Sequence, residues 1–128
     1  MNTIEVSSKE KNEIIDITSE VSSLINIKSG TCVVYCPHTT GAITTNENYD
    51  SDVKRDMIQK LNELSPDESY YQHSEGNSDA HVKSSLIGNS ETFIIEENKL
   101  VLGQWQGVFF YEFDGPRNRT IFVKIMGE

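Results

Sequence analysis

Hydrophobic positions along the chain follow two spacings, one typical of strands and one typical of helices. Strands are predicted where β-branched and aromatic residues form short runs bounded by turn residues. Residues 42–45 are expected to pair with residues 31–36. Residues 120–126 are apolar on both faces except at Lys124, so we expect this strand to be covered on both sides. Another subunit could supply one of the two covers. The predicted strands are residues 3–7, 12–15, 31–36, 42–45, 92–95, 100–102, 104–113 and 120–126.

Three segments have helical spacing. The first follows Asp16 or Thr18, and the second, which has the clearest apolar stripe, follows Asp50 or Ser51 and is stopped by Ser65-Pro66. The third, short helix begins after Asn77 or Ser78 and closes at Gly88, and the polar residues 67–77 before it are a loop. The apolar positions that define the three helices are Ile17, Val21, Leu24 and Ile25; Val53, Met57, Leu61 and Leu64; and Val82 and Leu86.

These elements predict a single α+β domain over residues 1–128. The chain has 128 residues, 36% of them hydrophobic, which suffices for one core. We expect a mostly antiparallel, sandwich-like β-sheet with two to three short helices. Between Gln104 and Phe113, the alternating face that carries Trp105, Phe109 and Tyr111 is the better candidate for the core.

Charge and hydropathy exclude several classes of partner. With 20 acidic and 11 basic residues the net charge is −9, which argues against nucleic acid and anionic membranes as partners. No run of about 18 apolar residues is present, so no membrane span is expected. The first residues, Met-Asn-Thr-Ile-Glu-Val, lack the basic and apolar regions of a signal peptide, so we expect a cytoplasmic protein.

The two cysteines, Cys32 and Cys36, are not expected to form a disulfide. Four residues apart in one strand, their Cα atoms would be roughly 13 Å apart, whereas a disulfide needs less than about 7 Å. They are interpreted as small buried residues, although Cys36 could line a site at His38.

The chain has only three histidines, His38, His73 and His81. His38 lies where a strand gives way to a loop, His73 lies in a polar loop, and His81 in the first turns of a helix. We expect the fold to bring all three together. Three imidazoles with one open position form a catalytic zinc arrangement, but this spacing is not diagnostic, and surface or hydrogen-bonding histidines remain the alternative.

Other polar residues are candidates for chemistry or binding near the histidines. The acids are candidate general bases or extra ligands, or else solvated charges. The turn Thr39-Thr40-Gly41 can hold an anion or be an ordinary turn. Asn77 can orient a substrate or cap a turn. The arginines beside Asp-Gly-Pro form the best anion clamp, or else are solvated hairpin charges. These candidates are Glu47 and Glu75; Thr39, Thr40 and Gly41; Asn77; and Arg117 and Arg119.

Several motifs together resemble the YjbQ-like family of small bacterial and archaeal proteins, known as secondary thiamine-phosphate synthases. The resemblance covers nearly the whole chain, and Asn98 is one small departure, where many relatives have glycine. It implies an antiparallel α+β fold, a homotrimer, and weak thiamine-phosphate synthase activity at a three-histidine site able to hold a divalent metal such as zinc. The motifs are Cys36-Pro-His-Thr-Thr-Gly-Ala42, Asn46-Glu47, His73, Gly76-Asn77, Ala80-His81 to Gly88, Leu102-Gly-Gln-Trp-Gln106 and Glu112-Phe-Asp-Gly-Pro-Arg117 with Arg119.

The leading hypothesis is therefore an enzyme, either a transferase or a metal-dependent hydrolase, that acts on a small phosphorylated or anionic molecule. His38, His73 and His81 would bind zinc, and His81 with Glu47 or Glu75 would carry the catalysis. Imidazole ligands favour zinc over the magnesium that usually accompanies diphosphate, so hydrolysis suits these residues better than thiamine-phosphate synthesis. Two alternatives are a non-catalytic trimer that binds a metabolite or anion, and a structural trimer whose histidines stabilise the fold.

Overall fold

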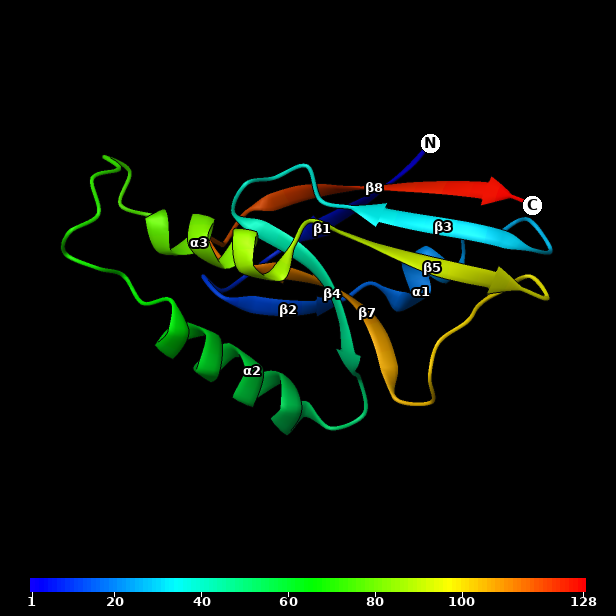
Figure 1. Ribbon diagram of the computed structural model, residues 1–128, viewed down its shortest axis with the longest axis horizontal. Helices are drawn as coiled ribbons and strands as arrows, with labels where there is room; N and C mark the ends of the chain where they lie inside the picture. The colour runs from blue at the N-terminus through cyan, green and yellow to red at the C-terminus, as the bar shows by residue number, and fades with distance from the viewer.

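The fold is built from eight strands and three helices, as seen in a computed structural model that describes residues 1–128 (Figure 1). The strands form two antiparallel sheets, one ordered β1-β8-β3-β5-β6 and the other β2-β7-β4. The elements are β1 (Asn2–Ser7), β2 (Glu13–Asp16), α1 (Thr18–Ser22), β3 (Gly30–Tyr35), β4 (Gly41–Glu47), α2 (Ser51–Leu64), α3 (Ser78–Ile87), β5 (Ser90–Glu96), β6 (Lys99–Leu100), β7 (Gln106–Glu112) and β8 (Asn118–Gly127).

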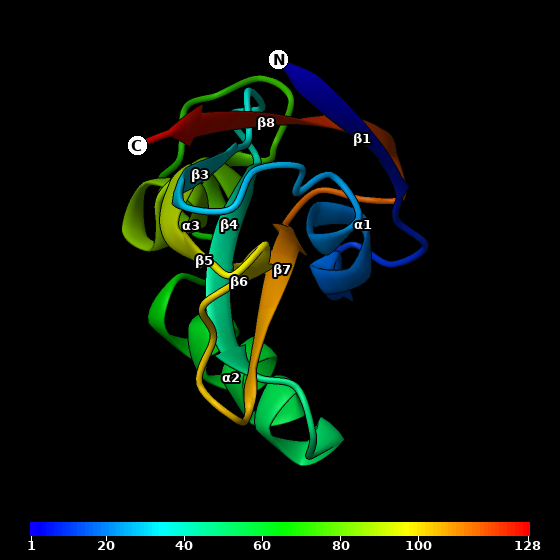
Figure 2. The same cartoon turned by 90° about the vertical axis from the view of Figure 1, so that its right-hand side faces the viewer.

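The main hydrophobic core lies between the two sheets. Inward side chains of the five-stranded sheet meet those of the three-stranded sheet and of α1, as in a sandwich. Figure 2 shows α1 beside β7 at one edge of this sandwich. The members of this core are Ile4, Val6, Ile17, Val21, Cys32, Val34, Cys36, Ile43, Phe93, Ile95, Val108, Phe110, Ile121 and Val123.

The helices α2 and α3 cover the opposite face of the three-stranded sheet. A second cluster joins Ala42, Tyr111 and Phe113 of that sheet and its following turn to Leu61 of α2 and Ala80 of α3. As a result β7 is buried on both faces. The predicted better core face, which carries Trp105 and Tyr111, packs on the helices, and Trp105 itself is 50% exposed. Val108 and Phe110 of the other face enter the main core instead, because the helices supply a second apolar layer for the predicted face.

The outer face of the five-stranded sheet has no such cover. Ile94 of β5 and Met126 of β8 both pair with Thr31 of β3, and their side chains are 58% and 43% exposed. On β8 the apolar residues alternate between the core and this open face, where Lys124 also lies. The expectation that residues 120–126 are covered on both sides is therefore not met within one chain.

The α+β class predicted from the sequence is confirmed, but one predicted strand pair is wrong. Residues 42–45 do form a strand, yet β4 pairs with β7, whereas β3 pairs with β5 and β8. The connection of residues 36–40 does not turn back as a hairpin. It carries the chain from the large sheet to the small one, a change that hydrophobic periodicity does not encode.

The two longer helices begin and end as predicted. The side chain of Asp50 accepts a hydrogen bond from the Asp52 N–H at 2.9 Å, which caps α2, and Ser65 ends that helix. Gly88 ends α3 with φ of 99°, in the left-handed region that favours glycine. No helix has both the length and the apolar content needed to cross a membrane.

Candidate functional site

The connection between β3 and β4 places His38 against the edge of β8. After Tyr35 the chain leaves the large sheet, and the Cys36 N–H donates to the Asn89 carbonyl at 2.8 Å. The imidazole Nε2 of His38 then lies 3.1 Å from both the N–H and the carbonyl oxygen of Thr120. His38 thus provides the hydrogen bond to β8 at the point where β3 no longer pairs with it.

A buried ion pair between Arg119 and Glu112 also stabilises the connection between β3 and β4. Arg119 Nε donates to Glu112 Oε1 at 2.9 Å, and Nη2 contacts Glu112 Oε2 and donates to Thr40 Oγ1 at 2.8 Å. Ser8 Oγ also donates to Glu112 Oε1, at 2.8 Å. Burial raises the pKa of Glu112, but the hydrogen bonds from Arg119 and Ser8 outweigh this and hold the pKa below its ordinary value.

On one side of this connection lies a polar cavity of about 420 Å³, which we name the charged chamber. The rings of His73, from the loop after α2, and His81, from α3, face each other edge to face with centroids 5.4 Å apart. The chamber has no hydrophobic side chain other than a proline. Its lining consists of Pro37, His38, Thr39, Thr40, His73, Glu75, Asn77, His81, Asp114, Arg117 and Arg119.

Asp114 organises one wall of the charged chamber. Its Oδ2 accepts from Arg117 Nη2 at 2.9 Å and from Asn77 Nδ2 at 2.8 Å, and its carbonyl accepts from Arg117 Nε at 2.8 Å. Asn77, at the N-terminus of α3, is buried, and its Oδ1 has no hydrogen-bond partner. Arg117 remains 51% exposed, so it is the arginine whose guanidinium reaches the open cavity.

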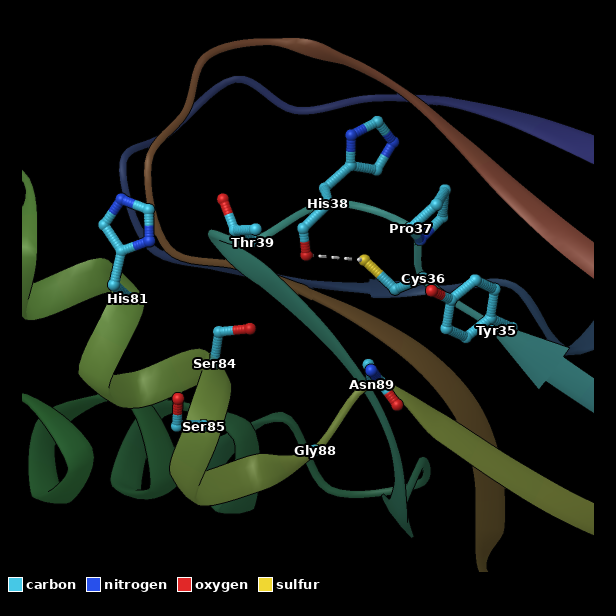
Figure 3. Close-up of a pocket in the computed structure, with 10 residues that line it drawn as sticks. All are labelled: Tyr35, Cys36, Pro37, His38, Thr39, His81, Ser84, Ser85, Gly88 and Asn89. Carbon is cyan, nitrogen blue, oxygen red and sulfur yellow. Dashed lines mark hydrogen bonds between the residues drawn. The ribbon is translucent and has the colours of Figure 1, made fainter.

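A second cavity of about 440 Å³ adjoins the first, and the two share Pro37, His38, Thr39 and His81. We name its remaining part the neutral chamber, because it has no aspartate, glutamate, lysine, arginine or histidine of its own (Figure 3). It lies between the connection and α3. The residues that belong to it alone are Tyr35, Cys36, Ser84, Ser85, Gly88 and Asn89.

Most of the predicted site residues lie in the charged chamber. Gly41 does not line either chamber, and a Cβ there would lie 2.7 Å from the buried Phe110 ring, so glycine is required for packing. Glu47 lies at the other end of β4, paired in register with Gln106, and the structure does not bring it to the histidines. The predicted residues that line the charged chamber are His38, Thr39, Thr40, His73, Glu75, Asn77, His81, Arg117 and Arg119.

Sequence reasoning missed several residues of the two chambers. Asp114 is not among the predicted site residues, although its spacing of three residues from Arg117 is a signal for a local ion pair. Ser84, Ser85 and Asn89 carry no pattern of their own. They lie beside His38 because α3 crosses the connection, where the Ser84 hydroxyl donates to the Gly41 carbonyl at 2.7 Å.

The predicted three-histidine zinc site is wrong. No group of three or more histidine, cysteine, aspartate or glutamate side chains is arranged to hold a metal ion. Only His73 and His81 face each other. The Nε2 of His38 bonds instead to the backbone of Thr120 in β8. Figure 3 shows the His38 ring pointing away from His81.

Comparison with known proteins identifies relatives over nearly the whole chain. The sequence profile of the family described as UPF0047 protein YjbQ-like matches residues 2–128. The chain is 47% identical over 131 residues to the UPF0047 protein YugU of Bacillus subtilis, covering 99% of each, and 50% identical to a UPF0047 protein of Methanocaldococcus jannaschii, covering 97% of this chain and 92% of that one.

Solved structures share the fold as well. An uncharacterised conserved protein of the YjbQ/UPF0047 family from Clostridium acetobutylicum has a TM-score of 0.96 at 46% identity, covering 98% of this chain and all of that one. A YbjQ-like protein of unknown function from Sulfolobus solfataricus has a TM-score of 0.95 at 34% identity, with coverages of 99% and 96%. None of these descriptions supports thiamine-phosphate synthase activity. Together with the absence of a metal-binding group of side chains, they overturn the prediction of a metal-dependent enzyme that acts on a phosphorylated substrate.

Proposed function

The chain belongs to the YjbQ-like UPF0047 family, and we propose that its charged chamber binds a small hydrophilic anion. The observation that carries this proposal is the convergence of His73, His81 and Arg117 in a cavity with almost no apolar lining. Imidazole and guanidinium N–H groups are strong donors to oxyanions. This function needs neither a bound metal nor a synthase reaction.

The charge of the chamber makes binding depend on the histidines. Arg117 is paired with Asp114 and Arg119 with Glu112, so these charges cancel. Glu75 also lines the chamber, which therefore has one uncompensated negative charge while the imidazoles are neutral. Histidine is the side chain whose charge changes between pH 5 and 8, and protonation of the facing pair would reverse the sign.

Titration of the protein with small anions at several pH values tests this proposal. Inorganic phosphate and sulfate are titrated calorimetrically at pH 5.5, 6.5 and 8.0. We expect affinity to fall as pH rises. His81→Gln and Arg117→Gln should each lower affinity about 10- to 100-fold, because a hydrogen bond to a charged group contributes about 1.5–3 kcal/mol.

The matched control is Arg55→Gln, since Arg55 is an exposed arginine on α2 outside both chambers. It changes net charge by the same amount as Arg117→Gln. Equal losses in the two arginine variants, or no heat of binding at pH 5.5 with millimolar anion, would refute the proposed site.

We also propose that the chain assembles as the homotrimer that the family resemblance implies, in the cytoplasm. What supports assembly is the uncovered face of the five-stranded sheet. There Ile94 and Met126 are exposed on either side of Thr31, with the half-buried Val33 and Phe122 on the same face. An exposed apolar sheet face of this kind is typical of an interaction surface.

A further inference from the structure

The charged chamber is only half of the hollow that surrounds the connection of residues 36–40. The neutral chamber opens beside it, and His38, Thr39 and His81 belong to both. A ligand whose anionic group sits between His81 and Arg117 would extend past Thr39 into the neutral chamber. The lining there must therefore match the rest of the ligand.

Beside the apolar surfaces of Tyr35, Cys36 and the shared Pro37, the neutral chamber offers hydroxyl and carboxamide groups without net charge. Ser84 uses its hydroxyl hydrogen on the Gly41 carbonyl, so its oxygen is left as an acceptor. Ser85 and Asn89 are exposed in the cavity wall. A serine hydroxyl and an asparagine carboxamide each donate and accept hydrogen bonds, as does a ligand hydroxyl.

The same lining is unfavourable for two other kinds of ligand. An extended apolar chain would displace water from these polar groups without replacing its hydrogen bonds, which costs about 1–3 kcal/mol for each group that becomes buried. A second charged group would find no fixed counter-charge among Ser84, Ser85 and Asn89. A row of ligand hydroxyls incurs neither penalty, because hydroxyls are uncharged and both donate and accept hydrogen bonds.

From this geometry, and resting on the proposed function, we infer that the ligand is a polyhydroxylated anion. Its anionic group lies in the charged chamber near His81 and Arg117, and its hydroxylated carbon chain lies along α3 against Ser84, Ser85 and Asn89. Two sources share this chemistry, a sugar acid with a carboxylate and a sugar or polyol phosphate.

Paired titrations at pH 6.0 test the inference. Gluconate is compared with acetate, and glucose 6-phosphate with inorganic phosphate, so that each pair differs in the hydroxylated body. We expect the hydroxylated member of at least one pair to bind at least 10-fold more tightly than its bare counterpart, and the pair that shows this identifies the anionic group. Sorbitol, which has hydroxyls but no charge, should not compete at millimolar concentration.

Two variants connect the gain in affinity to the neutral chamber. Ser85→Ala and Asn89→Ala remove exposed side chains that hold no hydrogen bond within the fold, so folding should be retained, and the affinity ratio in the responsive pair should fall below about 3-fold. Ser90→Ala is the matched control, because Ser90 is an exposed neighbour outside the chamber. Its ratio should match that of the unmodified protein.

The outcomes separate this inference from the proposed function. If acetate or phosphate binds but neither hydroxylated anion binds more tightly, the inference fails and the anion site stands. If no anion of either kind binds, the proposed function fails and the inference with it. A ratio that survives both Ser85→Ala and Asn89→Ala also overturns the inference, because the hydroxyls would then be bound elsewhere.

Discussion

Replacement of Glu112 by glutamine tests whether the buried ion pair sustains the fold around the site. Glu112 is fully buried, and it accepts hydrogen bonds from Arg119, from Ser8 and from the backbone N–H groups of Phe113 and Asp114. Glutamine keeps the volume, so no cavity forms. The variant leaves the Arg119 guanidinium buried without a counter-charge, which costs about 3–5 kcal/mol.

This cost is a large part of the total stability of a domain, about 5–15 kcal/mol. For a domain of this size, Tm should fall by roughly 10–20 °C. The free energy of unfolding is measured by urea titration, followed by far-UV circular dichroism. Arg55→Gln is the control, because the exposed pair of Arg55 with Asp52 should contribute less than about 1 kcal/mol.

A double-mutant cycle attributes the loss to the pair. The combined Glu112→Gln and Arg119→Met variant should be destabilised by about 1–3 kcal/mol less than the sum of the single variants, because the two groups interact directly. Strict additivity, or a loss below about 1 kcal/mol in Glu112→Gln alone, would refute the reasoning.

Two further predictions concern pH and assembly. Hydrogen bonds hold the pKa values of Glu112 and Asp16 below their ordinary values despite the opposing effect of burial, so both carboxyls bind fewer protons when folded than when unfolded. Their contribution to the free energy of unfolding is therefore complete above the ordinary carboxyl pKa of about 4. It is lost as pH falls through the pKa values of the folded state. A urea midpoint that stays unchanged when the pH is lowered from 6 to 3 would contradict this. Ile94→Lys, which places a charge on the open sheet face, should convert the proposed trimer to monomers in sedimentation equilibrium. Leu64→Lys, at an exposed apolar position on α2 away from this face, should not. A monomeric unmodified chain would exclude the trimer.

The sequence predicted the elements well where local chemistry determines them. The ends of α2 and α3 follow from Asp50, Ser65 and Gly88, which act through their own backbone and nearest neighbours. The absence of a disulfide between Cys32 and Cys36 follows from strand geometry alone, and the structure confirms both as free thiols. The partner of β4 depends on where the connection of residues 36–40 leads, which only the packed tertiary structure determines.

The candidate site was predicted in composition but not in arrangement. The sequence identified the three histidines, Asn77 and Arg117 because polar residues in loop-like surroundings are candidates for function. It could not show that the His38 ring would turn to β8, since that contact joins residues 82 positions apart. The same holds for Arg119, which was interpreted as a free anion clamp and is instead matched by Glu112.

The contact between His38 and β8 also has a consequence for how the site handles protons. The backbone of Thr120 presents a donor and an acceptor to the same ring nitrogen, each at 3.1 Å. When Nε2 is bare it can accept from the Thr120 N–H, and when it carries a hydrogen it can donate to the Thr120 carbonyl. Both neutral tautomers and the cation can therefore keep a bond to β8, so this contact between the connection and the sheet persists in every protonation state of a residue that both chambers share.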